Sequence, residues 1–217
     1  MFKIDVYGPF YKFLAKFTNY LILGVLWILA SLPVITIGAA NTAMYSTNHK
    51  VIQSGNGYMW KTFWAEFRSN FKQATLMWLI MILITVFLAA DCYFAYILSG
   101  VGGMGILLAV FLVMSAIFLA WSQLWFPYIS HIEDPIRVVL KNTLIMCFAH
   151  SGQSLLLLIL LVICAAILLF LPINPVSIVG VPILYAVFSY KRLFRIFINY
   201  WDMDDGHEDI LEEEASE

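Results

Sequence analysis

The chain has 217 residues, of which 62% are hydrophobic and 12% are charged, and its mean hydropathy is +0.87. A soluble domain is about 45–50% apolar and about 25% charged, so a water-soluble body of this size could not bury so much apolar surface. The composition excludes a disordered chain, a nucleic-acid-binding protein and a disulfide scaffold, and it predicts an all-α, polytopic transmembrane helical bundle.

Five apolar runs, taken in chain order, are candidates for membrane-spanning helices. They cover residues 20–40, 74–99, 101–126, 154–171 and 176–190, and the last run is shorter and contains a proline. A helix needs about 20 apolar residues to cross the hydrocarbon core. Because backbone polar groups in hydrocarbon must bond internally, we predict that the runs are helices and that the bundle has about five spans.

An amphipathic stretch at residues 58–72 precedes the second run. Its aromatic residues recur three or four positions apart, and they are Trp60, Phe63, Trp64, Phe67 and Phe71. Charged residues occupy the other faces, which suits a helix lying in the headgroup plane. The alternative is that the stripe packs on the bundle. We assign these five residues to interfacial contact or partner docking, and we expect an interfacial aromatic belt at Trp121, Trp125 and Tyr128.

The basic residues predict an orientation for the bundle. Residues 41–73, residues 127–153 and the segment after residue 190 carry nine Lys and Arg residues, whereas the turns at 99–103 and 172–175 carry none. Because basic loops stay in the cytoplasm, this pattern places the C-terminus inside and the N-terminus outside. In an alternative arrangement, Pro33 breaks the first run into a re-entrant hairpin, and all twelve basic residues then face the cytoplasm.

The acidic residues are concentrated at the end of the chain. Residues 202–217 hold nine acidic residues and no basic residue, whereas residues 1–201 hold twelve basic and five acidic residues. A basic body suits contact with anionic lipids. We predict one transmembrane domain over residues 1–201 and an acidic, disordered cytoplasmic tail over residues 202–217. The three cysteines lie in apolar stretches without a CxxC pair, and we expect them to pack as apolar side chains.

Three polar residues stand out as candidates for contact with a substrate or a proton. Asp91 lies inside the second run, where a lone carboxylate is costly unless it has a function. The alternatives for this residue are a position near the outer interface, within reach of water, or a carboxyl group that is simply protonated. Asn41 and Thr42 follow small residues that allow helices to approach closely, and their alternative role is hydrogen bonding between helices.

The sequence lacks the common motifs of catalysis and metal binding. It has no HExxH zinc motif, no GxSxG elbow and no GxxxxGK[ST] phosphate loop, so we expect no enzymatic activity, no cofactor and no metal. His131 and Glu133 lie close to Asp134-Pro135. We predict that Asp134 caps a helix whose first residue is Pro135, rather than taking part in catalysis.

The run at residues 26–40 reads LWILASLPVITIGAA and resembles the SLPVxTIGAA signature of the YesL-like bacterial membrane proteins. The resemblance continues over nearly the whole chain, through Ala43-Met44-Tyr45, Gly57-Tyr58, Phe63-Trp64, residues 70–75, and Lys141-Asn142 with His150. It implies a small polytopic protein of Gram-positive-type bacteria whose gene often lies beside genes for oligosaccharide ABC uptake and carbohydrate breakdown. No biochemical activity is established for that family, and the acidic tail departs from its pattern.

The expected function combines this resemblance with the absence of catalytic motifs. We expect a non-catalytic, multi-pass protein of the bacterial cell membrane that is an accessory component of carbohydrate (oligosaccharide) uptake. Its expected partners are membrane lipids and ABC permease subunits, with no nucleic acid. The alternative is a stand-alone small-molecule transporter that uses Asp91, for which a broken helix at Pro33 would be a further indication.

Overall fold

The computed structural model describes residues 9–53, 57–98 and 105–170, together with Val181, Tyr185, Phe188, Ser189, Arg192 and Leu193. Within these residues the fold is all-α, as predicted, and contains no strand. The helices are α1 (Pro9–Ser31), α2 (Ile37–Thr47), α3 (Met59–Ser69), α4 (Phe71–Leu98), α5 (Gly105–Ser122), α6 (Trp125–Ile129), α7 (Ile136–Ala149) and α8 (Ser151–Phe170). A short 3-10 turn, η1 (Val34–Thr36), and a π-helical turn, η2 (Asn48–Gln53), flank α2.

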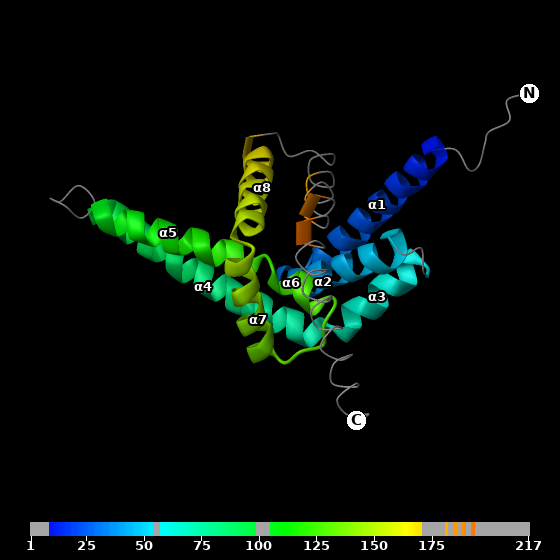
Figure 1. Cartoon of the computed structure of the whole chain (residues 1–217), viewed down its shortest axis with the longest axis horizontal. Coiled ribbons are helices and arrows are strands. Elements are labelled where there is room, and N and C mark those ends of the chain that lie inside the picture. The colour runs from blue at the N-terminus through cyan, green and yellow to red at the C-terminus, as the bar shows by residue number, and fades with distance from the viewer. Residues whose placement is uncertain are drawn as a thin grey trace, which may run out of the picture.

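The helices α4 and α5 form a long hairpin that projects from the rest of the molecule (Figure 1). Large apolar side chains cover its surface, and those that are more than half exposed include Leu83, Val86, Phe87, Ile106 and Val113. By length and composition, Phe71–Leu98 and Gly105–Ile129 can each cross a membrane. The second and third predicted spans are therefore confirmed as apolar helices that suit contact with lipid.

The first predicted span is broken at Pro33. Helix α1 ends at Ser31, because a proline cannot donate a backbone hydrogen bond and disfavours helical geometry at the residue before it. The Thr36 hydroxyl closes the turn by donating to the carbonyl oxygen of Ala30 at 2.6 Å. The prediction of one continuous helix over residues 20–40 is wrong, and the break that the alternative placed at Pro33 is confirmed.

Helix α2 is the buried centre of the first half of the chain, in contact with α1, α3, α4 and α6. Its small residues Ala39, Ala40 and Ala43 are fully buried. At Gly38 the backbone of α4 comes so close that an added Cβ atom would overlap Ala74 and would lie 2.6 Å from the Cβ atom of Trp78. The expected close approach of helices at these small residues is therefore present.

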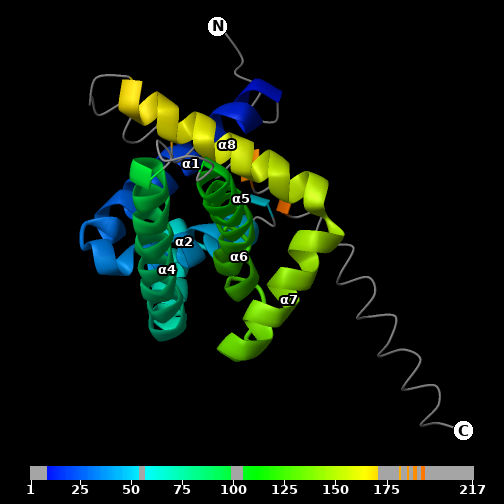
Figure 2. The ribbon, with the colours of Figure 1, turned by 90° about the vertical axis from the view of Figure 1, so that its left-hand side faces the viewer.

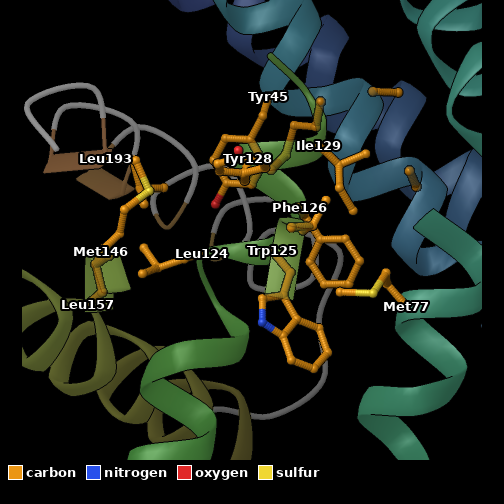
Figure 3. Close-up of a cluster of buried hydrophobic side chains, with 14 of the residues drawn as sticks. Tyr45, Met77, Leu124, Trp125, Phe126, Tyr128, Ile129, Met146, Leu157 and Leu193 are labelled. Carbon is orange, nitrogen blue, oxygen red and sulfur yellow. The ribbon is translucent and has the colours of Figure 1, made fainter. Parts of the chain in front are cut away.

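The hydrophobic core is centred on α6, where side chains of α2, α4, α7 and α8 surround those of α6 (Figure 3). Trp125 is fully buried, and its ring packs edge-on against Trp121, with the ring centroids 5.1 Å apart. Tyr128 is also almost fully buried and lies near Tyr45 of α2. The predicted interfacial belt is wrong for Trp125 and Tyr128, because both are core residues and not amphipathic anchors at the membrane surface.

Helices α7 and α8 meet at a sharp bend, which Figure 2 shows from the side. The two axes differ by 98° at His150, so the pair is either a broken span or a re-entrant loop. Helix α8 corresponds to the fourth predicted span. The described residues therefore contain two helices that are long and apolar enough to cross a membrane, or three such spans if this bent pair counts as one. Most of the fifth predicted span, and the whole acidic tail, lie outside the described residues.

Candidate functional site

The three polar residues predicted to contact a substrate or proton are not brought together. Asp91 lies on α4, seven residues before the helix ends at Leu98, which is about 10 Å along the axis. Its side chain is partly exposed and makes no hydrogen bond or ion pair with any residue that the structure describes. Asn41 and Thr42 lie on α2, in the interior of the molecule.

Thr42 and Asn41 have different surroundings although they are neighbours. The Thr42 side chain is fully buried and donates to the carbonyl oxygen of Gly38, one turn earlier in the same helix, at 3.1 Å. This bond satisfies the donor of the hydroxyl group within α2. Asn41 accepts a hydrogen bond from Trp27 Nε1 of α1 at 2.7 Å and lines a cavity.

This cavity, which we call the apolar cavity, has a volume of about 360 Å³ and lies where α1, α2, α4, α5, α6 and α8 meet. Its size falls within the range of roughly 300–1,000 Å³ that is common for small-molecule sites. Most of its wall is aliphatic or aromatic. The lining residues are Trp27, Asn41, Met44, Tyr45, Trp78, Met81, Leu119, Ser122, Gln123, Phe126, Leu161, Cys164, Ala165, Val181 and Tyr185.

The aromatic stripe predicted for residues 58–72 forms the helix α3, which ends at Ser69. Phe63 is fully buried and fixes α3 to the body, whereas 58% of the Trp60 surface is exposed. Trp64 and Phe67 are partly buried and continue an aromatic contact chain, with their ring centroids 5.3 Å apart. Phe71 begins α4 and packs on Phe67 at 5.5 Å. The stripe therefore has one side in the core and one side exposed.

A second cavity, which we call the polar pocket, has a volume of about 310 Å³. It lies between the end of α2, the end of α3 and the segment that follows α6. Its lining residues are Ser46, His49, Lys50, Glu66, Ser69, Asn70, Ile129, Ser130, His131 and Glu133. The Ser46 hydroxyl donates to the Ser130 carbonyl oxygen at 2.8 Å and so joins α2 to the segment after α6.

Two histidines lie side by side in the polar pocket. The ring centroids of His49 and His131 are 5.0 Å apart. The pKa of His131 is lowered from 6.5 to about 4, mainly by burial and in smaller part by the nearby His49 and Lys50, while the hydrogen bond to the Pro127 carbonyl oxygen and the charge of Glu66 oppose this shift. Burial, followed by the charge of Lys50, also lowers the pKa of His49. Both imidazoles are therefore predominantly neutral at pH 7.

The surroundings of His131 favour one tautomer of its neutral ring. The Ser130 hydroxyl donates to the carbonyl oxygen of Pro127 at 2.6 Å. His131 Nδ1 lies 2.6 Å from Ser130 Oγ and 3.0 Å from the same carbonyl oxygen. Because both neighbours of Nδ1 act as acceptors, the ring hydrogen resides on Nδ1. Ser130 and His131 thus form a local turn contact that holds the ring in place.

The charged groups of the polar pocket are mostly paired with each other. Lys50 Nζ lies 2.6 Å from Glu66 Oε1 and joins η2 to α3. Half of the Lys50 side chain is exposed, so we expect this ion pair to contribute no more than about 1 kcal/mol. No three His, Cys, Asp or Glu side chains in the described part of the chain are placed to hold a metal ion.

The predicted helix cap at Asp134 is wrong. Helix α7 begins after Pro135, which occupies the cap position without a side-chain hydrogen bond. Asp134 Oδ2 instead accepts from the Tyr128 hydroxyl at 2.6 Å, and the same hydroxyl accepts from Asn142 Nδ2 at 2.8 Å. Gln73 Nε2 of α4 donates to the Asp134 carbonyl oxygen at 2.7 Å. Asp134 therefore links α4 to α6, and the Tyr128 hydroxyl extends this network to α7.

Sequence reasoning found one part of the polar pocket and missed the rest. The proximity of His131 and Glu133 was visible in the chain, but His49, Lys50 and Glu66 come from segments far away in sequence. The only available signal was that charged and histidine side chains are rare in this chain. This rarity marks each charged residue and histidine outside the tail as a candidate site residue, but it does not show which of them lie together in the fold.

Comparisons with known proteins connect the chain to a family without an assigned activity. The family described as "Protein of unknown function, DUF624" matches residues 20–92. The chain is also similar to "Uncharacterized protein YteU" of Bacillus subtilis (strain 168), with 27% identity over 167 residues, which cover 75% of this chain and 73% of YteU. No solved structure matches the chain. The two matches support the resemblance to the YesL-like family.

Proposed function

We propose that this YesL-like protein is a non-catalytic membrane component that acts beside a carbohydrate (oligosaccharide) uptake system and binds permease subunits through α3. The apolar hairpin of α4 and α5 supports its place in the membrane. The family resemblance supports the uptake context, because genes of such proteins often lie beside genes for oligosaccharide ABC uptake. The geometry of α3 supports the contact surface.

One observation carries this proposal: α3 is fixed to the body on one side and presents aromatic side chains on the other. Phe63 is fully buried, whereas Tyr58 and Trp60 are 77% and 58% exposed. The Lys61 ammonium group lies 5.6 Å from the centroid of the Tyr58 ring, so a positive charge accompanies the aromatic surface. Tyr and Trp are enriched in protein interfaces, where they supply much of the binding energy.

The position of α3 also suits a role beside membrane-spanning partners. The helix has eleven residues, too few to cross a bilayer, and only Asn70 separates it from α4, which can cross. We therefore expect its exposed side to lie at the level where α4 enters the membrane. A partner with helices in the same membrane could contact Trp60 without entering the core of this protein.

Affinity purification from native membranes tests the proposal. The protein should recover ABC permease subunits, and Trp60→Ala should reduce that recovery at least five-fold, because an exposed hot-spot aromatic typically contributes more than about 1 kcal/mol. Phe94→Ala is the matched control, since Phe94 is 63% exposed on the distant part of α4. Recovery without permease subunits, or equal recovery from both variants, would contradict the proposal.

The transporter alternative depends on Asp91 and stays a prediction. Asp91 lines neither the apolar cavity nor the polar pocket. A transporter would require a pathway that reaches this carboxyl group from both sides of the membrane. The purification described above separates the two functions, because a stand-alone transporter needs no permease subunit.

A further inference from the structure

The apolar cavity contains a hydrogen-bonding group that the described residues around it leave unused. Asn41 Oδ1 accepts from Trp27 Nε1 at 2.7 Å, but no described residue accepts a hydrogen bond from the Asn41 amide nitrogen. Gln123 differs, because its Oε1 accepts from Tyr185 at 2.6 Å and its Nε2 donates to the Leu119 carbonyl oxygen at 3.3 Å. The Asn41 amide can therefore donate to a molecule in the cavity.

The rest of the wall selects for hydrocarbon. Met44, Met81, Leu161 and Val181 supply aliphatic or thioether surface, and aromatic rings supply much of the remaining wall. Apolar cavities of about 150 Å³ stay dry and bind apolar guests, and this cavity is more than twice as large. A sugar would bury several hydroxyl groups without partners here, which is costly. The wall therefore fits a long apolar chain with one hydrogen-bond acceptor.

The surroundings of the cavity identify the source of such a chain. Helices α4 and α5 contribute to the wall, and their outer surfaces are apolar and exposed, as at Leu83 and Val113. The cavity is partly open, and Ala165 of α8 both lines it and is exposed. In a membrane, the acyl chains of the bilayer are the most concentrated apolar molecules that can enter.

We propose that the apolar cavity binds one acyl chain of a glycerophospholipid, whose ester carbonyl oxygen accepts a hydrogen bond from the amide nitrogen of Asn41. The bound chain fills the space between α2 and α8 and completes the packing of the bundle. This proposal does not depend on the function proposed for α3, because the two surfaces share no residue. Each can fail while the other holds.

Fluorescence quenching by a brominated lipid tests occupancy of the cavity. The full-length protein is delipidated in detergent and titrated with phosphatidylcholine that carries 9,10-dibromostearoyl chains. Trp27 and Trp78 line the cavity, so we expect quenching that saturates at one lipid per protein, above a linear background from exposed residues such as Trp60. The double substitution Ser122→Leu/Cys164→Phe, which we call the filled variant, places two bulky side chains in the cavity and should weaken the saturable component at least ten-fold. Absence of saturation, or saturation unchanged by the filled variant, would overturn the proposal.

A second comparison tests the role of Asn41 and is independent of the filled variant. An ether-linked brominated lipid has the same chains but lacks the carbonyl oxygen. The wild-type protein should bind the ester lipid about five-fold more tightly, as expected for one hydrogen bond. Asn41→Leu should abolish this preference and still bind both lipids. Equal binding of ester and ether lipids by the wild-type protein would refute the proposed hydrogen bond.

Discussion

The substitution Gly38→Ala adds one methyl group at the closest approach of α2 and α4. The new Cβ atom would overlap the backbone of Ala74 and would lie 2.6 Å from the Cβ atom of Trp78. Carbon atoms in contact are normally about 3.5–4.0 Å apart, so the two helices would have to separate by about 1 Å. Neither obstacle can move by rotation of a flexible side chain, because one is backbone and the other is the first atom of a side chain.

This separation should cost about 1–3 kcal/mol, the usual range for overpacking a well-packed core. For a chain of this length, each kcal/mol corresponds to about 2–4 °C in Tm. We therefore expect Gly38→Ala to lower the Tm of the purified protein in detergent by roughly 5–10 °C. The shift should also disturb Trp78, whose Nε1 donates to the Val34 carbonyl oxygen at 2.8 Å.

Gly152→Ala is the matched control. An added Cβ atom at Gly152, in the first turn of α8, meets nothing within 4 Å. Alanine is favoured over glycine in a helix by up to about 1 kcal/mol, so this variant should be as stable as the wild type or slightly more stable. Equal Tm values for Gly38→Ala and Gly152→Ala would refute the reasoning that α2 and α4 are in backbone contact at Gly38.

Three further predictions follow from single residues. The folded-state pKa of His131 is about 4 against 6.5 when unfolded, so the unfolded state binds more protons between these values and stability must fall as the pH decreases. The free energy of unfolding should be about 2 kcal/mol smaller at pH 5 than at pH 8, which a lower Tm would show. His131→Asn should remove most of this difference, and a pH-independent Tm of the wild-type protein would contradict the prediction. If Asp91 acts by ionising, Asp91→Asn should keep the wild-type Tm but abolish the growth advantage on the cognate sugar, whereas normal growth would return Asp91 to a structural role. If the predicted orientation is right, a cysteine at Gly102 should be labelled from outside intact cells and one at Ser69 should not, and the reverse pattern would exclude it.

The apolar hairpin of α4 and α5 was predictable from sequence, because the mean hydropathy of a segment depends only on the residues within that segment. Helix α4 ends within one residue of the predicted boundary, and α5 lies within the predicted run 101–126. The break after Ser31 was predictable only as an alternative. Pro33 removes a hydrogen bond, but proline is tolerated in some transmembrane helices, so composition alone did not decide between a kink and a break.

The contents of the core were less predictable than the helices. Trp125 and Tyr128 have the amphipathic character of interfacial anchors, and only the position of α6 among other helices shows that they are buried. The same holds for Asp134, whose side chain suits a helix cap but bonds to Tyr128 in the folded protein. Local preference ranks the options for such residues, and tertiary packing selects among them.

The cavities could not be predicted from sequence, because each is assembled from distant segments. His49 and His131 are separated by 82 positions, yet their ring centroids lie 5.0 Å apart. Asn41 was singled out for its polarity beside small residues, and it does line the apolar cavity. Its partner Trp27 was not identified, because the hydrogen bond between them requires α1 and α2 to fold back on each other after Pro33.

Site-specific photo-crosslinking tests the proposed contact of α3 with a permease most directly. A photoreactive phenylalanine analogue would replace Trp60, and in a matched strain it would replace Phe94, in cells grown on the oligosaccharide whose uptake genes lie nearest. We predict a crosslinked product that contains a permease subunit from position 60 and none from position 94. Crosslinks to lipid alone at both positions would contradict the account, because α3 would then be a membrane-surface helix and not a docking site.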